Sequence, residues 1–241
     1  IHWSMVADGL QVLTNEIFDV SGARLYATFC RIHIEATVPM ATFRENEEII
    51  GKGVIKRYGQ GLFFSDIDFQ GDGRFIRATI MSSFAKRGID GSNVGLVKAG
   101  VPIISDDCPI ENLEALPDFS SKYNERRNSK PNTPLFECEY KINPYLDING
   151  VGLLYFAAYQ AILDKCELQY IDNGPKWAQE TSTVERDIFY FANTDINEKL
   201  IYRTHNWKET NLEVIIENSL SRASDGVLMA YAITRKARLV S

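Results

Sequence analysis

The chain has 241 residues, of which 45% are hydrophobic and 24% are charged, and its formal net charge is −6. This composition is typical of a globular protein and excludes a disordered chain or a collagen-like repeat. A protein that holds nucleic acid by neutralising phosphates needs clustered excess cations, so the charge argues against a nucleic-acid partner. Chains of this length form one large domain or two small ones.

The first third of the chain is predicted to form the end of a helix followed by four strands. Residues 2–12 have helical character, and the sequence opens at Ile1 without an initiator Met, so we expect a preceding segment that includes an opening strand. Four later runs alternate apolar and polar residues, which is typical of strands with one buried face. These runs are residues 24–36, 49–58, 62–69 and 75–84.

A polar segment separates the two halves of the chain. Residues 86–134 are rich in Gly, Asp, Asn, Ser and Pro, and they are long for a loop within one domain. We therefore predict a crossing linker between a first unit at residues 1–85 and a second unit at residues 135–241.

The second half repeats the order of the first, with its opening strand present at residues 135–142. The most apolar stretch of the chain predicts a long helix at residues 150–170. Its apolar part, residues 151–163, is too short for a membrane span, which needs about 20 residues, and its side chains surround the helix. Four more strands are predicted at residues 184–191, 200–207, 212–221 and 227–238.

One architecture satisfies this order in both halves. A curled antiparallel sheet wrapped around a helix buries that helix on every side but one. The sequence therefore predicts an α+β double hotdog, in which two antiparallel sheets each wrap around a long apolar helix. The edges of such sheets commonly pair with the sheet of another copy, so a homodimer is one of the open alternatives.

Familiar catalytic and metal-binding motifs are absent from the sequence. The four cysteines are far apart and form no C-x-x-C pair, and the three histidines lie in segments with adequate structural roles. Neither a metal site nor an organic cofactor is expected. Free cysteines without a secretory signal lead us to expect a reduced, cytoplasmic compartment.

The informative block is residues 143–159, which joins a predicted strand to the buried helix through a polar turn. Asn149, Gly150 and Gly152 would leave unpaired backbone N–H groups at the positive end of the helix. Such an end stabilises negative charge on a carbonyl oxygen, as in an enolate or a tetrahedral intermediate. An ordinary Asn-Gly turn, with glycine admitted for close packing, explains the same residues equally well.

The same block resembles the strand–turn–helix of hotdog acyl-thioester enzymes, in which an acidic residue before the helix often activates water. Aligned on the pattern D-x-D-x-x-G, Asp147 matches the first acid, but Asn149 stands at the second. A neutral amide cannot act as a general base, so this departure argues against simple thioester hydrolysis. Asp147 remains a candidate base for a thioesterase or dehydratase that acts on acyl-CoA or on acyl carrier protein.

A second resemblance covers most of the chain. Residues 22–32 (GARLYATFCRI), residues 81–84 (MSSF) and residues 147–159, in this order, are similar to the LnmK-like family of double-hotdog proteins. That family belongs to polyketide biosynthesis and is related to the leinamycin-pathway bifunctional acyltransferase/decarboxylase. The resemblance implies methylmalonyl-CoA as substrate, loss of carbon dioxide, and transfer of propionyl to an acyl carrier protein through an acylated tyrosine.

Tyr26 is the candidate for this tyrosine, because it lies in the strand of the first unit that carries the resemblance. A tyrosine hydroxyl is a weak nucleophile near neutral pH, so it needs a cationic or hydrogen-bonding neighbour. Arg24 shares the strand face of Tyr26 and is the nearest such residue in sequence. A tyrosine that only packs over the helix is an equal alternative. Other tyrosines near the helix mouth are Tyr145, Tyr155 and Tyr159.

The remaining catalytic candidates follow from the chemistry of a malonyl-type thioester. Its decarboxylation leaves an enolate, whose oxygen would be held by backbone N–H groups near Gly150 and by the Asn149 amide. Ser82 or Ser83 would orient the carboxylate that is lost.

The linker is expected to bind the rest of the substrate. Arg87, Asn93 and Lys98 are candidates for contacts with the phosphates of coenzyme A, while Gly152 and Tyr155 would line the site beside the helix. A non-catalytic module that binds acyl carrier protein is a further hypothesis. Because that partner is acidic, it would need a local basic patch, such as residues 126–127 or the C-terminal cluster.

Overall fold

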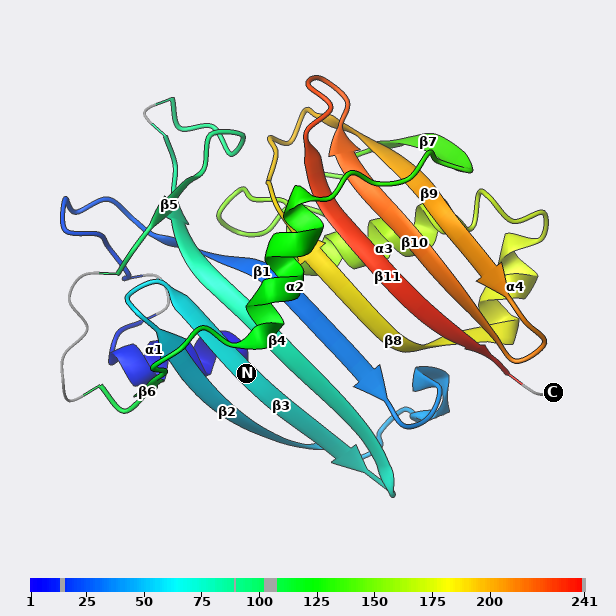
Figure 1. Cartoon of the computed structure of the whole chain (residues 1–241), viewed down its shortest axis with the longest axis horizontal. Coiled ribbons are helices and arrows are strands. Elements are labelled where there is room, and N and C mark those ends of the chain that lie inside the picture. Colours follow the sequence, from blue (N-terminus) through cyan, green and yellow to red (C-terminus); the bar gives the residue numbers. More distant parts are fainter. Residues whose placement is uncertain (14–15, 89, 102–107, 240–241) are drawn as a thin grey trace.

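The strands of both halves join into one 11-stranded sheet in the computed structural model, which describes residues 1–13, 16–88, 90–101 and 108–239 (Figure 1). The strands of the first half are β1 (Tyr26–Ala36), β2 (Ile50–Tyr58), β3 (Leu62–Gly71), β4 (Arg74–Lys86), β5 (Val97–Ala99) and β6 (Glu111–Asn112). Those of the second half are β7 (Phe136–Lys141), β8 (Thr181–Tyr190), β9 (Lys199–Glu209), β10 (Glu213–Arg222) and β11 (Leu228–Arg238).

The order across the sheet is β6-β2-β3-β4-β1-β8-β11-β10-β9-β7, and β5 pairs with β4. The helices are α1 (His2–Leu10), α2 (Asp118–Asn128), α3 (Phe156–Glu167) and α4 (Gly174–Glu180), with a short 3-10 turn at Met40–Thr42. The strand periods in the sequence therefore predict the long strands of both halves, with ends that shift by a few residues.

The two units meet where β1 pairs with β8. Strand β1 pairs with β4 along its whole length, whereas β8 pairs only with residues 31–35 of β1. This shorter pairing begins beside a bulge between Phe29 and Arg31. Residues 26–30 therefore have no β8 partner, and the sheet is open there. The sequence predicts two sheets, and this pairing joins them edge to edge.

Helix α3 is the buried helix that the sequence predicts. Tyr159, Ile162 and Leu163 are at most 2% exposed and belong to a core that includes side chains of both units. The helix covers Phe156–Glu167 rather than residues 150–170, because a hydrogen-bonded turn with a bridge between Ile148 and Leu154 precedes it. Among the described helices, none is both long enough and apolar enough to cross a membrane.

Helix α1 covers the sheet of the first unit. Val6 is fully buried in a cluster with Phe63 and Phe84. A β-carbon added at Gly53 of β2 would lie 2.9 Å from the sulfur of Met5, so glycine lets the helix approach the strand closely.

The predicted linker contains helix α2, which was not predicted from the sequence. In Figure 1 this helix crosses in front of the sheet, whereas α3 lies behind it. The guanidinium of Arg31 donates to the carbonyl of Phe119 at 2.7 Å, and the Tyr123 hydroxyl donates to the carbonyl of Tyr190 at 3.2 Å. Helix α2 thus contacts both β1 and β8 on the face opposite to α3.

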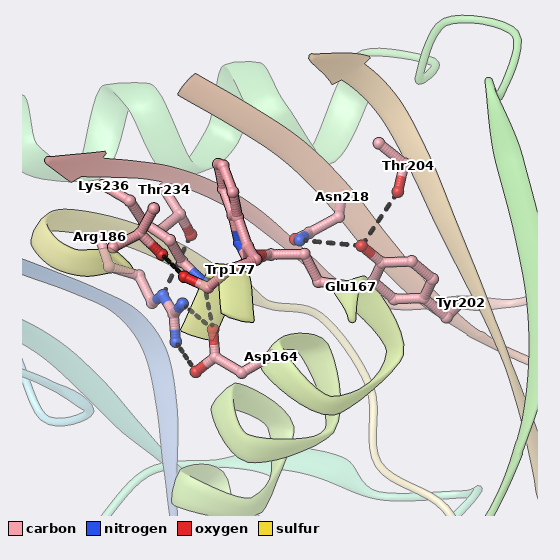
Figure 2. Close-up of polar contacts among 10 residues, drawn as sticks. Asp164, Glu167, Trp177, Arg186, Tyr202, Thr204, Asn218, Thr234 and Lys236 are labelled. Atoms are coloured by element: carbon pink, nitrogen blue, oxygen red, sulfur yellow. Dashed lines mark hydrogen bonds and ion pairs between the residues drawn. The ribbon is translucent and has the colours of Figure 1, made fainter. Parts of the chain in front are cut away.

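A buried ion network holds the C-terminal end of α3 against the sheet. Figure 2 shows Arg186 of β8 paired with Asp164, at 2.5 Å for the shorter contact, and Lys236 of β11 reaching Glu167 at 2.6 Å. Glu167 is 1% exposed, and burial raises its pKa while the charge of Lys236 opposes that shift. Trp177 of α4 also donates to Glu167. Cations near the C-terminal end of a helix also interact favourably with the negative end of its dipole.

We predict that Lys236→Met lowers the free energy of unfolding by about 3–5 kcal/mol, because it leaves Glu167 buried without a counter-ion. The double variant Lys236→Met/Glu167→Leu should recover most of this loss. Lys199→Met is the matched control, since Lys199 and Glu139 form an ion pair with both side chains at least half exposed. Urea denaturation measures all three variants, and equal losses for Lys236→Met and Lys199→Met would contradict the prediction.

Candidate active site between the two units

A cavity of about 690 Å³ lies at the opening of the sheet between β1 and the end of β8. Its walls come from the first half of β1, the end of β4, β5, helix α2, the turn before α3 and the residues that follow β8. Because residues 26–30 lack a β8 partner, side chains from both faces of β1 reach it. The cavity therefore depends on the presence of both units.

One side of the cavity is apolar and aromatic. The rings of Phe29 and Phe156 lie with their centroids 4.1 Å apart, and this pair joins β1 to the start of α3. Trp3 of α1 contacts Phe29 and Phe84 edge-on or tilted, at 5.4 and 5.9 Å between centroids. This wall can bury an apolar chain.

Tyr26 lies in the polar part of the cavity beside two guanidinium groups. Arg87 Nη1 donates to the Tyr26 hydroxyl at 3.3 Å, and its Cζ lies 4.9 Å from the centre of the ring. The Cζ of Arg24 lies 5.6 Å from the same centre. The phenol therefore has the cationic and hydrogen-bonding neighbours that a tyrosine nucleophile requires.

The N-terminus of α3 forms the opposite wall. The Asn149 side-chain oxygen accepts from the backbone N–H groups of Val151 and Leu153, at 3.1 and 3.0 Å, and thereby shapes the turn. The helix has no side-chain cap and no acid in its first turn. Within the described part of the chain, the N–H groups of Phe156 and Ala157 have no acceptor. Phe156 lines the cavity, so its N–H group can stabilise negative charge that develops there.

No family model and no curated protein matches the sequence. Solved structures do match. A structure described as an oleoyl thioesterase from Lactobacillus plantarum aligns with a TM-score of 0.67 at 12% identity, over 98% of this chain and 84% of that one. The 12:0-ACP thioesterase from Umbellularia californica aligns with a TM-score of 0.60 at 11% identity, over 89% and 74%. A MaoC-like dehydratase from Phytophthora capsici aligns with a TM-score of 0.51 at 13% identity, over 89% and 72%.

The chain has a double hotdog fold. At these identities the likeness shows the fold alone, and it confirms the predicted α+β class. The finer resemblance to the LnmK-like family stays a prediction.

The double hotdog brings together only part of the predicted site. Tyr26, Ser83, Lys98, Asn149 and Tyr155 all line the cavity. Six other candidates do not line it, and these are Ser82, Arg87, Asn93, Asp147, Gly150 and Gly152. Of these, Arg87 and Asn93 lie directly behind the wall, where they contact Tyr26 and the turn before α3.

Ser82 and Ser83 lie on opposite faces of β4. Ser82 is fully buried and makes a hydrogen bond with His2 of α1 at 2.8 Å, away from the cavity. The register places Ser83 opposite Thr28, on the face that carries Tyr26. Only Ser83 is therefore positioned to contact a substrate.

Asp147 holds the turn and does not line the cavity. Its carboxylate oxygen Oδ2 accepts from the Tyr140 hydroxyl at 2.9 Å and from the N–H of Asn143 at 2.7 Å. Its carbonyl also accepts from the N–H of Tyr155, at 2.7 Å. The side chain is 5% exposed, so its role is to stabilise the turn that precedes α3.

The alternative tyrosines have different surroundings. Tyr145 is 92% exposed and lies outside the cavity. Tyr155 lines the mouth, and the Tyr159 hydroxyl donates to the carbonyl of Ala192 at 2.8 Å. Burial raises the pKa of Tyr159 strongly, which disfavours its phenolate. Tyr26 is the tyrosine of this group that contacts a guanidinium through its hydroxyl.

The cavity also contains residues that were not predicted as site residues from the sequence. Arg127 of α2 lines it beside Lys98 and Cys30, although the sequence suggested Arg127 only as part of a partner-binding patch. Asn193, which follows β8, accepts from the N–H of Leu154 and donates to its carbonyl, and so fixes the segment before α3. The sequence marks Asn193 only as turn punctuation.

The lining residues that the structure describes include no carboxylate and no histidine. The same part of the chain holds no group of three or more His, Cys, Asp or Glu side chains suited to a metal ion. The chemistry that the lining residues can supply is therefore that of a phenol, a thiol, hydroxyls, cations and backbone N–H groups.

We predict that Asp147→Ala lowers the free energy of unfolding by about 1.5–3 kcal/mol, because one buried and one partly buried donor lose their acceptor. Asp147→Asn should lose less than half of this amount, since its amide oxygen can take the place of Oδ2. Urea denaturation distinguishes the two variants. If Asp147→Ala unfolds at the wild-type urea concentration, the carboxylate does not hold the turn.

Proposed function

We propose that this protein is an enzyme that cleaves acyl thioesters, with the acyl group of an acyl-CoA or an acyl carrier protein bound in the cavity between the units. One observation carries the proposal: Tyr26, in contact with Arg87, shares a cavity with the uncapped N-terminus of α3. The aligned structures from Lactobacillus plantarum and Umbellularia californica are described as thioesterases, which supports the same class of substrate.

The first step is transfer of the acyl group to Tyr26. The Tyr26 oxygen attacks the thioester carbonyl carbon, and the N–H group of Phe156 stabilises the oxyanion. The carbon–sulfur bond then breaks, and the leaving thiolate takes up the proton that the phenol has lost. The products of this step are a tyrosyl ester and a free thiol, and Arg87 stabilises the negative charge on the phenol oxygen during attack.

Hydrolysis of this ester completes a thioesterase reaction. Water breaks the bond between the acyl carbon and the Tyr26 oxygen, which yields the carboxylic acid and restores the phenol. The described lining offers no general base for either step, so the N–H group of Phe156 is the group that assists both attacks by stabilising the oxyanion. The predicted base, Asp147, uses its carboxylate within the turn instead.

Acyl transfer with decarboxylation is the second candidate, and the position of Ser83 favours it. Ser83 lines the cavity on the face of β4 that is opposite Thr28 and Tyr26, and it can orient the free carboxylate of the acyl group. Loss of carbon dioxide from methylmalonyl thioester would leave an enolate, which takes up one proton to become propionyl. The tyrosyl ester would then pass propionyl to the thiol of an acyl carrier protein.

Intact-protein mass spectrometry and a free-thiol assay test both candidates. We predict that wild-type protein incubated with acyl-CoA thioesters releases coenzyme A and carries an acyl adduct, and that Tyr26→Phe loses both signals. Tyr145→Phe is the control, because this exposed tyrosine lies outside the cavity.

The two candidates give different products. Thiol release that continues without an acceptor indicates hydrolysis, while a propionyl adduct from methylmalonyl-CoA indicates decarboxylation and transfer. Binding of acyl carrier protein with no thiol release from any thioester would overturn the proposal and support a non-catalytic module. An adduct that persists in Tyr26→Phe would place the nucleophile elsewhere.

We predict that Lys98→Ala and Arg127→Ala each raise the KM for acyl-CoA about two- to fivefold, because both cations line the cavity and are exposed to solvent. The KM for the matching N-acetylcysteamine thioester, which has no phosphate, should not change. Lys122→Ala is the control, since Lys122 is an exposed residue of α2 that does not line the cavity. Equal effects on both substrates would contradict a phosphate contact.

A further inference from the structure

We infer that Asn93 and Asp195 are positioning residues that hold the Arg87 guanidinium between Tyr26 and the turn before α3. This inference rests on the proposed function and adds to it, because neither residue lines the cavity. The two candidate parts of the active site belong to different units, and the Arg87 side chain makes hydrogen bonds to both of them.

Arg87 bridges the units with three of its nitrogens. Nη1 donates to the hydroxyl of Tyr26 in the first unit at 3.3 Å. Nη2 donates to the carbonyl of Val151, in the turn of the second unit, at 2.5 Å. Nε donates to the side-chain oxygen of Asn93 at 2.9 Å. The rigid plane of the guanidinium thus fixes the phenol relative to the turn that leads to α3.

Asn93 is suited to this place because it must accept and donate at once. Its oxygen accepts from Arg87, while its amide nitrogen donates to the carbonyl of Gly152 at 2.6 Å and to that of Thr194 at 3.3 Å. The residue is 5% exposed. An aspartate here would set a second carboxylate oxygen against two carbonyl oxygens, which is unfavourable.

Asp195 holds the loop that carries Asn93. Its two carboxylate oxygens accept from the Ser92 hydroxyl at 2.6 Å and from the N–H of Asn93 at 2.9 Å. These hydrogen bonds, together with the charges of Arg87 and Arg222, lower the pKa of Asp195 and keep it ionised near neutral pH. The chain of contacts therefore runs from the second unit through the linker to Tyr26.

This arrangement differs from the phosphate contacts that the sequence predicts for Arg87 and Asn93. Both side chains direct their polar groups at the protein, whereas Lys98 and Arg127 are exposed at the mouth. The cations around Tyr26 are Arg24 and Arg87 beside the ring, with Lys98 and Arg127 on the cavity wall. Displacement of Arg87 removes the cation that contacts the Tyr26 hydroxyl.

Single-turnover acylation of Tyr26 tests the inference in the full-length protein. In Asp195→Asn and in Asn93→Asp we expect the acylation rate constant to fall about tenfold to 100-fold, because small errors in placement cost this much. The KM for acyl-CoA should change less than twofold. Asp68→Asn is the control, since this exposed carboxylate pairs with Arg77 on the sheet of the first unit. A raised KM with an unchanged rate constant would overturn the inference.

Chemical rescue separates positioning from general structural damage. Added guanidinium ion should restore part of the acylation rate of Arg87→Ala, because it can occupy the position beside Tyr26, and it should not restore Tyr26→Phe. If Asn93→Asp fails to fold, Asp195→Asn decides, since it keeps the shape of the side chain. Rescue that is equal in Arg87→Ala and Tyr26→Phe counts against the inference.

A second measurement does not depend on activity. The Nε–H proton of Arg87, identified by its loss in Arg87→Lys, should exchange with water at least about tenfold faster in Asp195→Asn than in wild type. Faster exchange in a protein that acts on no thioester would refute the proposed function alone. Unchanged exchange in a protein that does act on thioesters would refute the positioning role alone.

Discussion

The short pairing of β1 with β8 is the constraint on which the rest of the structure depends. It joins two sheets over residues 31–35 of β1 and stops beside the bulge at Cys30. Had the pairing continued, the backbone of residues 26–30 would be covered and the cavity would close. The candidate site therefore exists because the pairing of β1 with β8 is interrupted, which leaves residues of both units lining one cavity.

Helix α3 has opposite surroundings at its two ends. At the C-terminal end, buried cations from β8 and β11 pair with Asp164 and Glu167 and fix the helix against the sheet. At the N-terminal end no side chain caps the helix and its first turn holds no acid, so the positive end of the dipole is available to a ligand. The anchored end keeps the free end in place, which is what preorganised stabilisation of an oxyanion requires.

Much of the fold could be predicted from sequence, because strand alternation and the apolar run of α3 are local signals. Helix α2 has local signals as well, with Asp118 at its start and Arg127 at its end, but its nearly uniform polarity hides them. The site is less predictable. Ser82 and Ser83 are neighbours in sequence, but they lie on opposite faces of β4 and so have different surroundings. Arg87 owes its role to contacts with Asn93, Val151 and Tyr26, which lie far apart in sequence.

The choice between two nucleophiles in the same cavity follows from burial. A thiol is ordinarily a better nucleophile than a phenol near neutral pH, and Cys30 lies on the cavity wall. However, burial raises the pKa of Cys30 to about 11, and the nearby charges of Lys98 and Arg127 offset this only in part. Tyr26 is partly exposed and its hydroxyl contacts a guanidinium. Burial therefore suppresses the thiolate of Cys30, whereas the Tyr26 hydroxyl is accessible and contacts a guanidinium, which makes Tyr26 the stronger candidate for the covalent step.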